Sequence, residues 1–256
     1  MLLTLNEGIL YGPVNSRRYG KSLGINLMPW RYKFCSFNCV YCHFGWTDKR
    51  AMDSSECTDD MPAFDDVVTE VERAAKSSLE FGLFTFSGNG EPTLYPRFAE
   101  LVDAVAAIRD RHRPDARVML LSNSTNLGNE DVRASLGKID LPILKLDAGT
   151  EKGFRAINRP ALDIDYDTLV QQLCSIDRLY IQSVLVDGHP SNTSPDDLAA
   201  YYDKIKRIQP QEVHIYSIDR PVPESRLRLV PPERLRTIAE EGERVTGVRM
   251  RAFGMN

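Results

Sequence analysis

The sequence predicts an α/β fold with a parallel sheet. Short apolar runs alternate with amphipathic segments six times along the 256-residue chain. No internal repeat, and no long linker rich in Pro, Gly or Ser, interrupts this alternation. Strands that alternate with helices form βαβ units, and their right-handed crossovers curl the sheet toward a barrel. Because six units are fewer than the eight of a closed (β/α)8 barrel, we expect a partial, open (β/α)6 barrel.

The strands are predicted from short runs of apolar and β-branched residues. In chain order they cover residues 22–28, 82–86, 118–121, 142–147, 179–186 and 212–218, and a short last strand covers 248–253. The helices are predicted from apolar residues at helical spacing, such as Val67, Val71 and Ala74. They cover residues 63–77, 96–110, 129–136, 151–157, 166–176, 195–208 and 232–244. Ser194 followed by Pro195 is typical of an N-cap and a first helical position.

Length and composition predict one soluble, globular domain over residues 1–256, with a core at about 18–221 and a C-terminal extension at 222–256. No apolar run approaches the ~20 residues of a membrane span. The opening MLLTLNEGILYG has neither a basic segment nor a long apolar core, so we expect no signal peptide and a cytoplasmic protein. A formal net charge of −4 argues against nucleic-acid binding but does not exclude a local basic patch.

Polar side chains follow the predicted strands at one edge of the sheet. The segments 35–42, 87–91 and 122–124 follow the first three strands, and Lys145 and Asp147 close the fourth. Tyr216, Asp219 and Arg220 follow the sixth. Since the carboxyl ends of parallel strands carry the chemistry in such folds, we expect the functional site at this edge.

Cys35, Cys39 and Cys42 lie within eight residues, a density that points to ligands of one metal centre. Three thiolates can bind three irons of a cubane cluster and leave the fourth open. Three alternatives remain: buried apolar cysteines, zinc completed by His43, and c-type haem at the C-x-x-C-H stretch 39–43. Haem leaves Cys35 unexplained. Cys57 and Cys174 lack the spacing of a second cluster, and we expect core or surface thiols there.

The pattern C-x-x-x-C-x-Tyr-C resembles the signature of the radical S-adenosylmethionine (radical SAM) superfamily, with Tyr41 in the aromatic position. Downstream, FSGNGEPT at 86–93 resembles the Gly-Gly-Glu-Pro element of that superfamily. The phrases YGPVNSRRYGKSLGINL, LKLDAGTEKGFRAINRP and HIYSIDRP are similar to a stand-alone branch related to the wyosine tRNA-modifying synthase. This resemblance implies the same partial barrel, one [4Fe–4S] cluster on the three cysteines, and S-adenosylmethionine (SAM) as cofactor.

The resemblance also implies which residues contact SAM. The predicted set is Tyr41, Gly88, Asn89, Gly90, Glu91 and Asn123. Backbone carbonyls at Gly88 and Gly90 suit the methionine ammonium, and Glu91 adds a compensating charge. Asn89 separates the two glycines, which leaves open the carbonyl that faces SAM. The glycine segment also has the residues of a plain turn, and Asn123 is equally suited to capping the following segment.

The predicted catalytic and substrate residues are Arg18, Lys145, Asp147, Tyr216, Asp219 and Arg220. Lys145 and Asp147 share one face of a strand, so a structural ion pair is an alternative to SAM contact. Arg17 and Arg18 suit a phosphate or a carboxylate, with solvated surface arginines as the alternative. His43 is either a proton donor or a loop residue.

The predicted activity is reductive cleavage of SAM to a 5′-deoxyadenosyl radical that abstracts hydrogen from a substrate. A nucleoside or tRNA, a small metabolite and a protein residue are the substrate classes considered. An external donor of the flavodoxin or ferredoxin type would supply the electron. The sequence lacks the additional cysteines of the wyosine synthase, which argues against wyosine formation itself. The alternative function is a non-catalytic iron–sulfur or zinc module with a regulatory or scaffold role.

Overall fold

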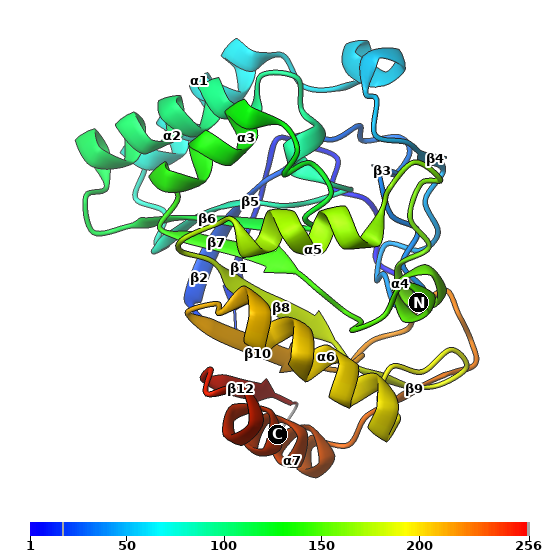
Figure 1. Cartoon of the computed structure of the whole chain (residues 1–256). Helices are drawn as coiled ribbons and strands as arrows, with labels where there is room; N and C mark the ends of the chain where they lie inside the picture. Colours follow the sequence, from blue (N-terminus) through cyan, green and yellow to red (C-terminus); the bar gives the residue numbers. More distant parts are fainter. Residues whose placement is uncertain (17, 255–256) are drawn as a thin grey trace. The chain divides into compact units, whose positions relative to one another are not determined.

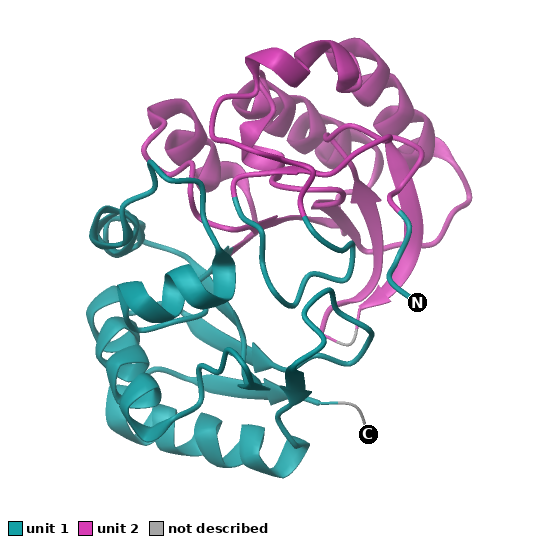
Figure 2. Cartoon of the chain, turned by 90° about the vertical axis from the view of Figure 1, so that its right-hand side faces the viewer, with its two compact units in different colours: residues 1–4, 37–46, 144–256 teal, residues 5–36, 47–143 magenta. Residues whose placement is uncertain are grey.

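The structure is a computed structural model that describes residues 1–16 and 18–254. These residues form two compact units, which Figure 2 shows in different colours. Unit 1 comprises residues 1–4, 37–46 and 144–256, and unit 2 comprises residues 5–36 and 47–143. Cys35 therefore belongs to unit 2, whereas Cys39 and Cys42 belong to unit 1. The single domain expected from the sequence stays a prediction.

Unit 2 contains a mostly parallel sheet in the order β1-β2-β5-β6-β7. Strand β1 is antiparallel to β2, whereas β2, β5 and β6 are parallel. The helices α1, α2 and α3 lie side by side in Figure 1. The elements are β1 Leu10–Ser16, β2 Gly20–Ile25, β3 Phe34–Cys35, β4 Lys49–Arg50, η1 Ser55–Asp60, α1 Phe64–Lys76, β5 Leu83–Phe86, η2 Pro92–Leu94, α2 Phe98–His112, β6 Arg117–Ser122, α3 Glu130–Ser135, η3 Leu136–Lys138 and the first residues of β7 Leu141–Lys145.

Unit 1 contains the last residues of β7 and a sheet in the order β7-β8-β10-β12. Strands β8, β10 and β12 are parallel, and β9 pairs with β11 in a separate antiparallel ribbon. Figure 1 shows α6 and α7 beside these strands. The elements are α4 Glu151–Asn158, α5 Tyr166–Cys174, β8 Tyr180–Val184, β9 Val186–Gly188, α6 Pro195–Ile208, β10 Glu212–Tyr216, β11 Leu227–Leu229, α7 Pro232–Thr246 and β12 Met250–Phe253.

The predicted α/β class with a parallel sheet is confirmed. The six strands expected from the sequence correspond to β2, β5, β6, β7, β8 and β10, and the expected last strand corresponds to β12. Ser194 caps α6 as predicted, because its side chain accepts a hydrogen bond from the Asp197 N–H. Strand β1 was not predicted, since Gly12 and Pro13 interrupt its apolar pattern. Pro is tolerated there because β1 is an edge strand.

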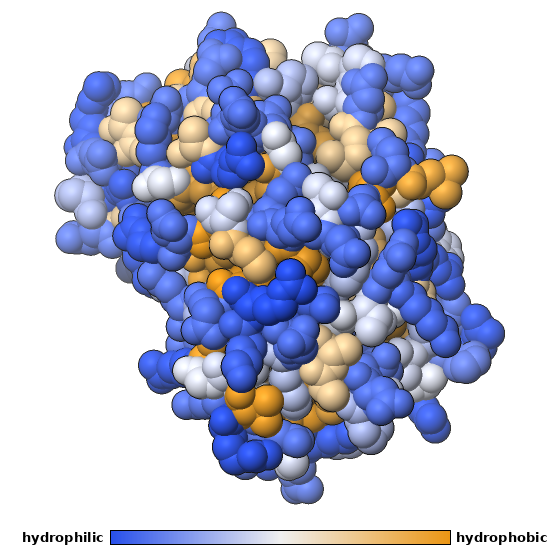
Figure 3. Space-filling view, viewed as in Figure 1, coloured by the Kyte–Doolittle hydropathy of each residue, from blue (hydrophilic) through white to orange (hydrophobic). Residues whose placement is uncertain are grey.

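The face drawn in Figure 3 is predominantly hydrophilic, and its apolar residues show as smaller patches between the hydrophilic ones. Among the residues that the structure describes, no helix combines the length and the apolar character needed to cross a membrane.

Candidate functional site

In unit 2, Cys35 is held next to the glycine loop 88–91 by a close backbone approach. Phe34 forms an isolated parallel bridge with Gly90. A Cβ atom on Gly90 would lie 1.7 Å from the Phe34 carbonyl oxygen, so only glycine allows this approach. The glycine at position 90 therefore fixes the strand that carries Cys35.

Gly88 and Asn89, at the start of the glycine loop, are held by close contacts and hydrogen bonds to the N-terminal part of unit 2. The side chain of Asn89 accepts from the Asn6 N–H at 2.8 Å and donates to the Asn6 and Pro29 carbonyls at 2.9 and 3.0 Å. A Cβ atom on Gly88, where φ is +142°, would meet Asn26 Oδ1 at 2.4 Å. The side chain of Asn89 thus fastens the N-terminal segment of unit 2, a role that the sequence did not indicate.

Glu91 is buried and accepts hydrogen bonds through both carboxylate oxygens. Oε1 accepts from the Thr93 N–H at 3.1 Å, the Thr93 hydroxyl at 2.6 Å and the Ser122 hydroxyl at 2.7 Å. Oε2 accepts from the Asn123 N–H at 2.6 Å. Burial raises the pKa of Glu91, and the hydrogen bonds oppose this shift. This carboxylate ties the glycine loop to the end of β6.

Asn123 contacts Cys35 directly. Its Nδ2 donates to the Ser36 hydroxyl at 2.8 Å and lies 3.6 Å from the Cys35 sulfur. Its Oδ1 accepts from the N–H and the hydroxyl of Thr125 at 3.1 and 2.8 Å. Both ends of the amide are therefore engaged within unit 2. The Oδ1 contacts are local bonds to the following segment, as in the capping role that was the alternative to SAM binding.

In unit 1, the cysteine loop docks on the C-terminal end of α4. The Asn38 N–H donates to the Asn158 carbonyl at 3.0 Å, and the Val40 N–H donates to the Ile157 carbonyl at 3.0 Å. These bonds satisfy carbonyls that the end of a helix leaves without intrahelical partners. The helix stops because Arg159 adopts a left-handed backbone conformation with φ of 45°. The end of α4 therefore fixes the position of Cys39.

Behind this loop lies a buried network centred on Asp147. Its Oδ2 accepts from the Tyr41 hydroxyl and, at 2.6 Å, from Asn158 Nδ2. Its Oδ1 accepts from the Val184 N–H at 2.7 Å and from Lys145 Nζ at 3.4 Å. The ion pair that was the structural alternative for Lys145 and Asp147 is thus present. The ammonium of Lys145 also lies 5.0 Å from the centroid of the Tyr41 ring.

Burial shifts several pKa values in this network. Burial and the nearby Asp147 charge raise the pKa of Tyr41 well above its usual value. Burial is the largest single influence on the pKa of Lys145 and lowers it. Asp147, Tyr216 and Cys39 together outweigh burial, and the pKa is raised. Burial, with the charges of Asp147 and Cys42, raises the pKa of the Cys39 thiol to about 11. A thiolate at Cys39 therefore requires a compensating cation.

The remaining predicted residues are partly brought together. Tyr216 lies with the Asp147 network, since Lys145 Nζ is 5.8 Å from its ring centroid. Asp219 pairs with His43 at 3.5 Å, and Arg220 is exposed in the following loop. Arg18 comes just before the start of β2, whereas the glycine loop follows the end of β5. Because β2 and β5 are parallel, the two lie at opposite ends of these strands. The structure therefore does not bring Arg18 to that loop. Arg17 lies outside the described residues.

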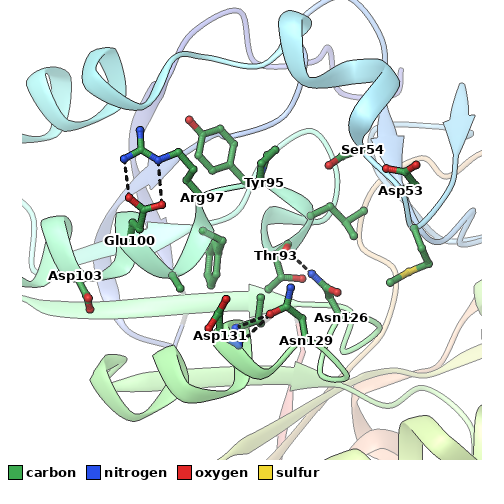
Figure 4. A pocket seen from close by; sticks show the side chains of 16 residues that line it. Asp53, Ser54, Thr93, Tyr95, Arg97, Glu100, Asp103, Asn126, Asn129 and Asp131 are labelled. Atoms are coloured by element: carbon green, nitrogen blue, oxygen red, sulfur yellow. Dashed lines mark hydrogen bonds and ion pairs between the residues drawn. The ribbon is translucent and has the colours of Figure 1, made fainter.

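Unit 2 also contains a polar cavity of about 470 Å³ that the sequence did not indicate. Figure 4 shows Arg97 paired with Glu100, and Asn126 donating to the Thr93 carbonyl at 2.6 Å. Thr93 belongs both to this cavity and to the hydrogen bonds of Glu91. None of the predicted site residues lines it.

The donor chemistry of the cysteines fits an iron–sulfur group. All five cysteines are free thiols. Cys35 and Cys39 each lie 3.6 Å from the amide nitrogen of a buried asparagine, which is an arrangement suited to cluster sulfurs. Among the described residues, no group of three or more His, Cys, Asp or Glu is placed to hold a metal ion. The fit of the cysteines to an iron–sulfur group is therefore argued from the asparagine contact of Cys35 in unit 2 and that of Cys39 in unit 1.

Comparison with known proteins identifies the class. A family model described as the radical SAM superfamily matches residues 31–171, which is more than half of the chain. This range contains the three cysteines and the glycine loop. The chain therefore belongs to the radical SAM superfamily.

The particular relatives include UPF0026 proteins. The chain is 30% identical over 229 residues to a UPF0026 protein of Methanocaldococcus jannaschii, covering 88% of this chain and 67% of that protein. It is 31% identical over 208 residues to a Brachyspira hyodysenteriae protein named GTPase Obg, covering 78% of this chain. The chain spans only 29% of the length of that Brachyspira protein.

A solved structure of TYW1 with a lysine–pyruvate adduct bound matches with a TM-score of 0.57 and 16% sequence identity. The match covers 87% of this chain and 73% of that chain. At this identity the likeness shows the fold, and it confirms the partial-barrel α/β class predicted from the sequence.

Proposed function

We propose that this radical SAM enzyme holds one [4Fe–4S] cluster on Cys35, Cys39 and Cys42. The observation that carries the proposal is the three-cysteine motif inside the matched superfamily range. Asn123 Nδ2 lies 3.6 Å from the Cys35 sulfur, and Asn158 Nδ2 lies 3.6 Å from the Cys39 sulfur. When bound, the cluster supplies the electron that cleaves SAM to methionine and a 5′-deoxyadenosyl radical, which abstracts hydrogen from the substrate.

The protein's own residues position and shield the reacting groups. Glu91 ties the glycine loop to the end of β6 and so fixes the backbone carbonyls that would face the SAM methionine. The buried Asp147 network packs behind the loop that carries Cys39 and keeps water from it. The Tyr41 ring and the Lys145 ammonium, which lies 5.0 Å from the ring centroid, belong to the same shielding network. Each group is pre-organised by contacts within its own unit.

For the substrate, we propose a nucleoside or tRNA, ahead of a small metabolite or a protein residue. Two observations support this choice: the quoted phrases resemble the wyosine-related branch, and the fold is like that of TYW1. We further propose a flavodoxin- or ferredoxin-type electron donor. Wyosine itself is not the proposed product, because the sequence lacks further clustered cysteines.

The test is anaerobic SAM cleavage. Purified protein is reconstituted with iron and sulfide, reduced with dithionite, and assayed for 5′-deoxyadenosine. Cys39→Ala should abolish the product, whereas Cys174→Ala, which changes an exposed thiol, should leave it unchanged. No product from wild-type protein with a full cluster would refute the enzyme and support the non-catalytic iron–sulfur module. Bound zinc in place of iron would refute the cluster.

The substrate class is tested with deuterium. Candidate tRNA, nucleosides, metabolites and peptides, each deuterated at carbon, are added to the cleavage reaction. Deuterium in 5′-deoxyadenosine from tRNA or a nucleoside supports the proposed class. Deuterium that comes only from a metabolite or a peptide contradicts it.

A further inference from the structure

Asn158, the last residue of α4, is a buried asparagine that the sequence did not single out. Its Nδ2 lies 2.6 Å from Asp147 Oδ2, 3.3 Å from the Tyr41 hydroxyl oxygen and 3.6 Å from the Cys39 sulfur. All four residues belong to unit 1. One amide group therefore connects the Asp147 network to a cysteine of the motif.

The orientation of this amide is determined by its neighbours. Asp147 presents a carboxylate, which only accepts, so the NH2 end of Asn158 must face it. Turning the amide over would place Oδ1 against Asp147 Oδ2. The Oδ1 atom is buried and has no hydrogen-bond partner in the described structure. The arrangement thus keeps an N–H directed toward the Cys39 side of the network.

The backbone holds Asn158 in place. Its carbonyl accepts from the Asn38 N–H, one residue before Cys39, and the left-handed Arg159 ends the helix directly after it. Asp147 is itself held by the Val184 N–H at 2.7 Å. The amide and the thiol are therefore fixed on the same local framework, and their separation does not depend on a mobile side chain.

We propose that Asn158 is a positioning residue that directs an N–H at the Cys39 thiolate and raises the reduction potential of the bound cluster. This inference rests on the proposed function. Reduction increases the negative charge on the cluster sulfurs, so an N–H dipole stabilises the reduced state more than the oxidised state. In unit 2, Asn123 has the same relation to Cys35, with its Nδ2 also 3.6 Å from the sulfur.

The test is an EPR-monitored redox titration of the reconstituted protein. Asn158→Leu keeps a similar volume and removes the donor. We expect the equilibrium constant for one-electron reduction to fall about threefold to tenfold, where tenfold equals about 59 mV. Asn158→Ser keeps a polar group too short to reach the sulfur and should shift the potential in the same direction. It also serves as the second variant if the leucine variant does not fold.

Asn192→Leu is the matched control. Asn192 is a buried asparagine of the same unit that donates to the Asp147 and Val184 carbonyls at 2.7 and 2.8 Å. Its substitution should leave the potential unchanged. The inference is overturned if Asn158 variants with a full iron complement keep the wild-type potential, or if the control shifts it equally. A wild-type protein that binds no cluster would refute the proposed function instead, and the two failures are therefore distinguishable.

Discussion

Glu91→Gln tests whether the buried carboxylate holds the glycine loop to the end of β6. In the structure, the backbone N–H of Thr93 donates to Oε1, and that of Asn123 donates to Oε2. A glutamine has one oxygen in place of two. Whichever way its amide is turned, one of these two N–H groups faces an NH2 group and loses its acceptor. The substitution is therefore isosteric but breaks the network.

The size of the effect follows from the bond that is lost. A hydrogen bond to a charged group contributes about 1.5 to 3 kcal/mol, and a buried N–H left without an acceptor costs a similar amount. The bond energy and the cost of the unpaired N–H describe the same lost bond, to Thr93 or to Asn123, so only one of them counts. We expect the free energy of unfolding to fall by about 2 to 3 kcal/mol, out of the 5 to 15 kcal/mol that is usual for a folded domain.

The assay is urea unfolding of cluster-free protein at pH 7, followed by circular dichroism. With a denaturant slope of about 2 to 3 kcal/mol/M, the midpoint should fall by about 1 M. Glu100→Gln is the control, because Glu100 is exposed and pairs with Arg97. It should change stability by less than about 0.5 kcal/mol. A Glu91→Gln midpoint within error of wild type would refute the network described for this carboxylate.

The same variant has a pH signature. Burial raises the pKa of folded Glu91 above its usual 4.5. Between that value and the raised pKa the folded state binds more protons than the unfolded state, so stability falls as pH rises through this window. The glutamine side chain of the variant has no such titration. The stability of wild type minus that of the variant should be largest below pH ~4.5 and decrease above it. An increase across the window would contradict the raised pKa.

Three further substitutions test particular contacts. Gly90→Ala places a Cβ atom 1.7 Å from the Phe34 carbonyl oxygen. It should lower the free energy of unfolding by more than about 3 kcal/mol and should also lower the iron content after reconstitution. Gly82→Ala, with no atom within 4 Å of its Cβ, should change neither quantity. Ser194→Ala removes the cap of α6 and should reduce the free energy of unfolding by about 1 kcal/mol in urea titration. Asp147→Ala leaves the Lys145 ammonium without its buried partner and should destabilise by about 3 to 5 kcal/mol; a loss below about 1 kcal/mol would contradict the ion pair.

The sheet strands were predictable because their apolar runs and intervening helical stripes are local patterns. Strand β1 was not, because Gly12 and Pro13 break its pattern and its place at the sheet edge is a tertiary property. Lys145 and Asp147 were expected on one face of a strand, and the alternation of side chains was enough to predict their ion pair as an alternative.

The functional site was predictable only where the spacing of residues along the sequence forms a motif. The cysteine motif and the glycine loop are short local patterns. The reason for glycine at position 90 is the approach of the Phe34 carbonyl, which depends on a distant segment. Asn158 lies within the quoted phrase LKLDAGTEKGFRAINRP, but no spacing marked it, because its contact with Cys39 joins residues 119 positions apart in the chain. Side-chain amides that meet only in the folded state leave no pattern in a single sequence.

The most direct test of the central claim is Mössbauer spectroscopy of protein reconstituted with ⁵⁷Fe, measured with and without SAM. If Cys35, Cys39 and Cys42 hold a [4Fe–4S] cluster with one open iron, SAM should change the signal of one iron site and leave the other three unchanged. The Cys39→Ala variant should show no such cluster. A wild-type spectrum without a [4Fe–4S] signal, or one that SAM does not alter, would contradict the account.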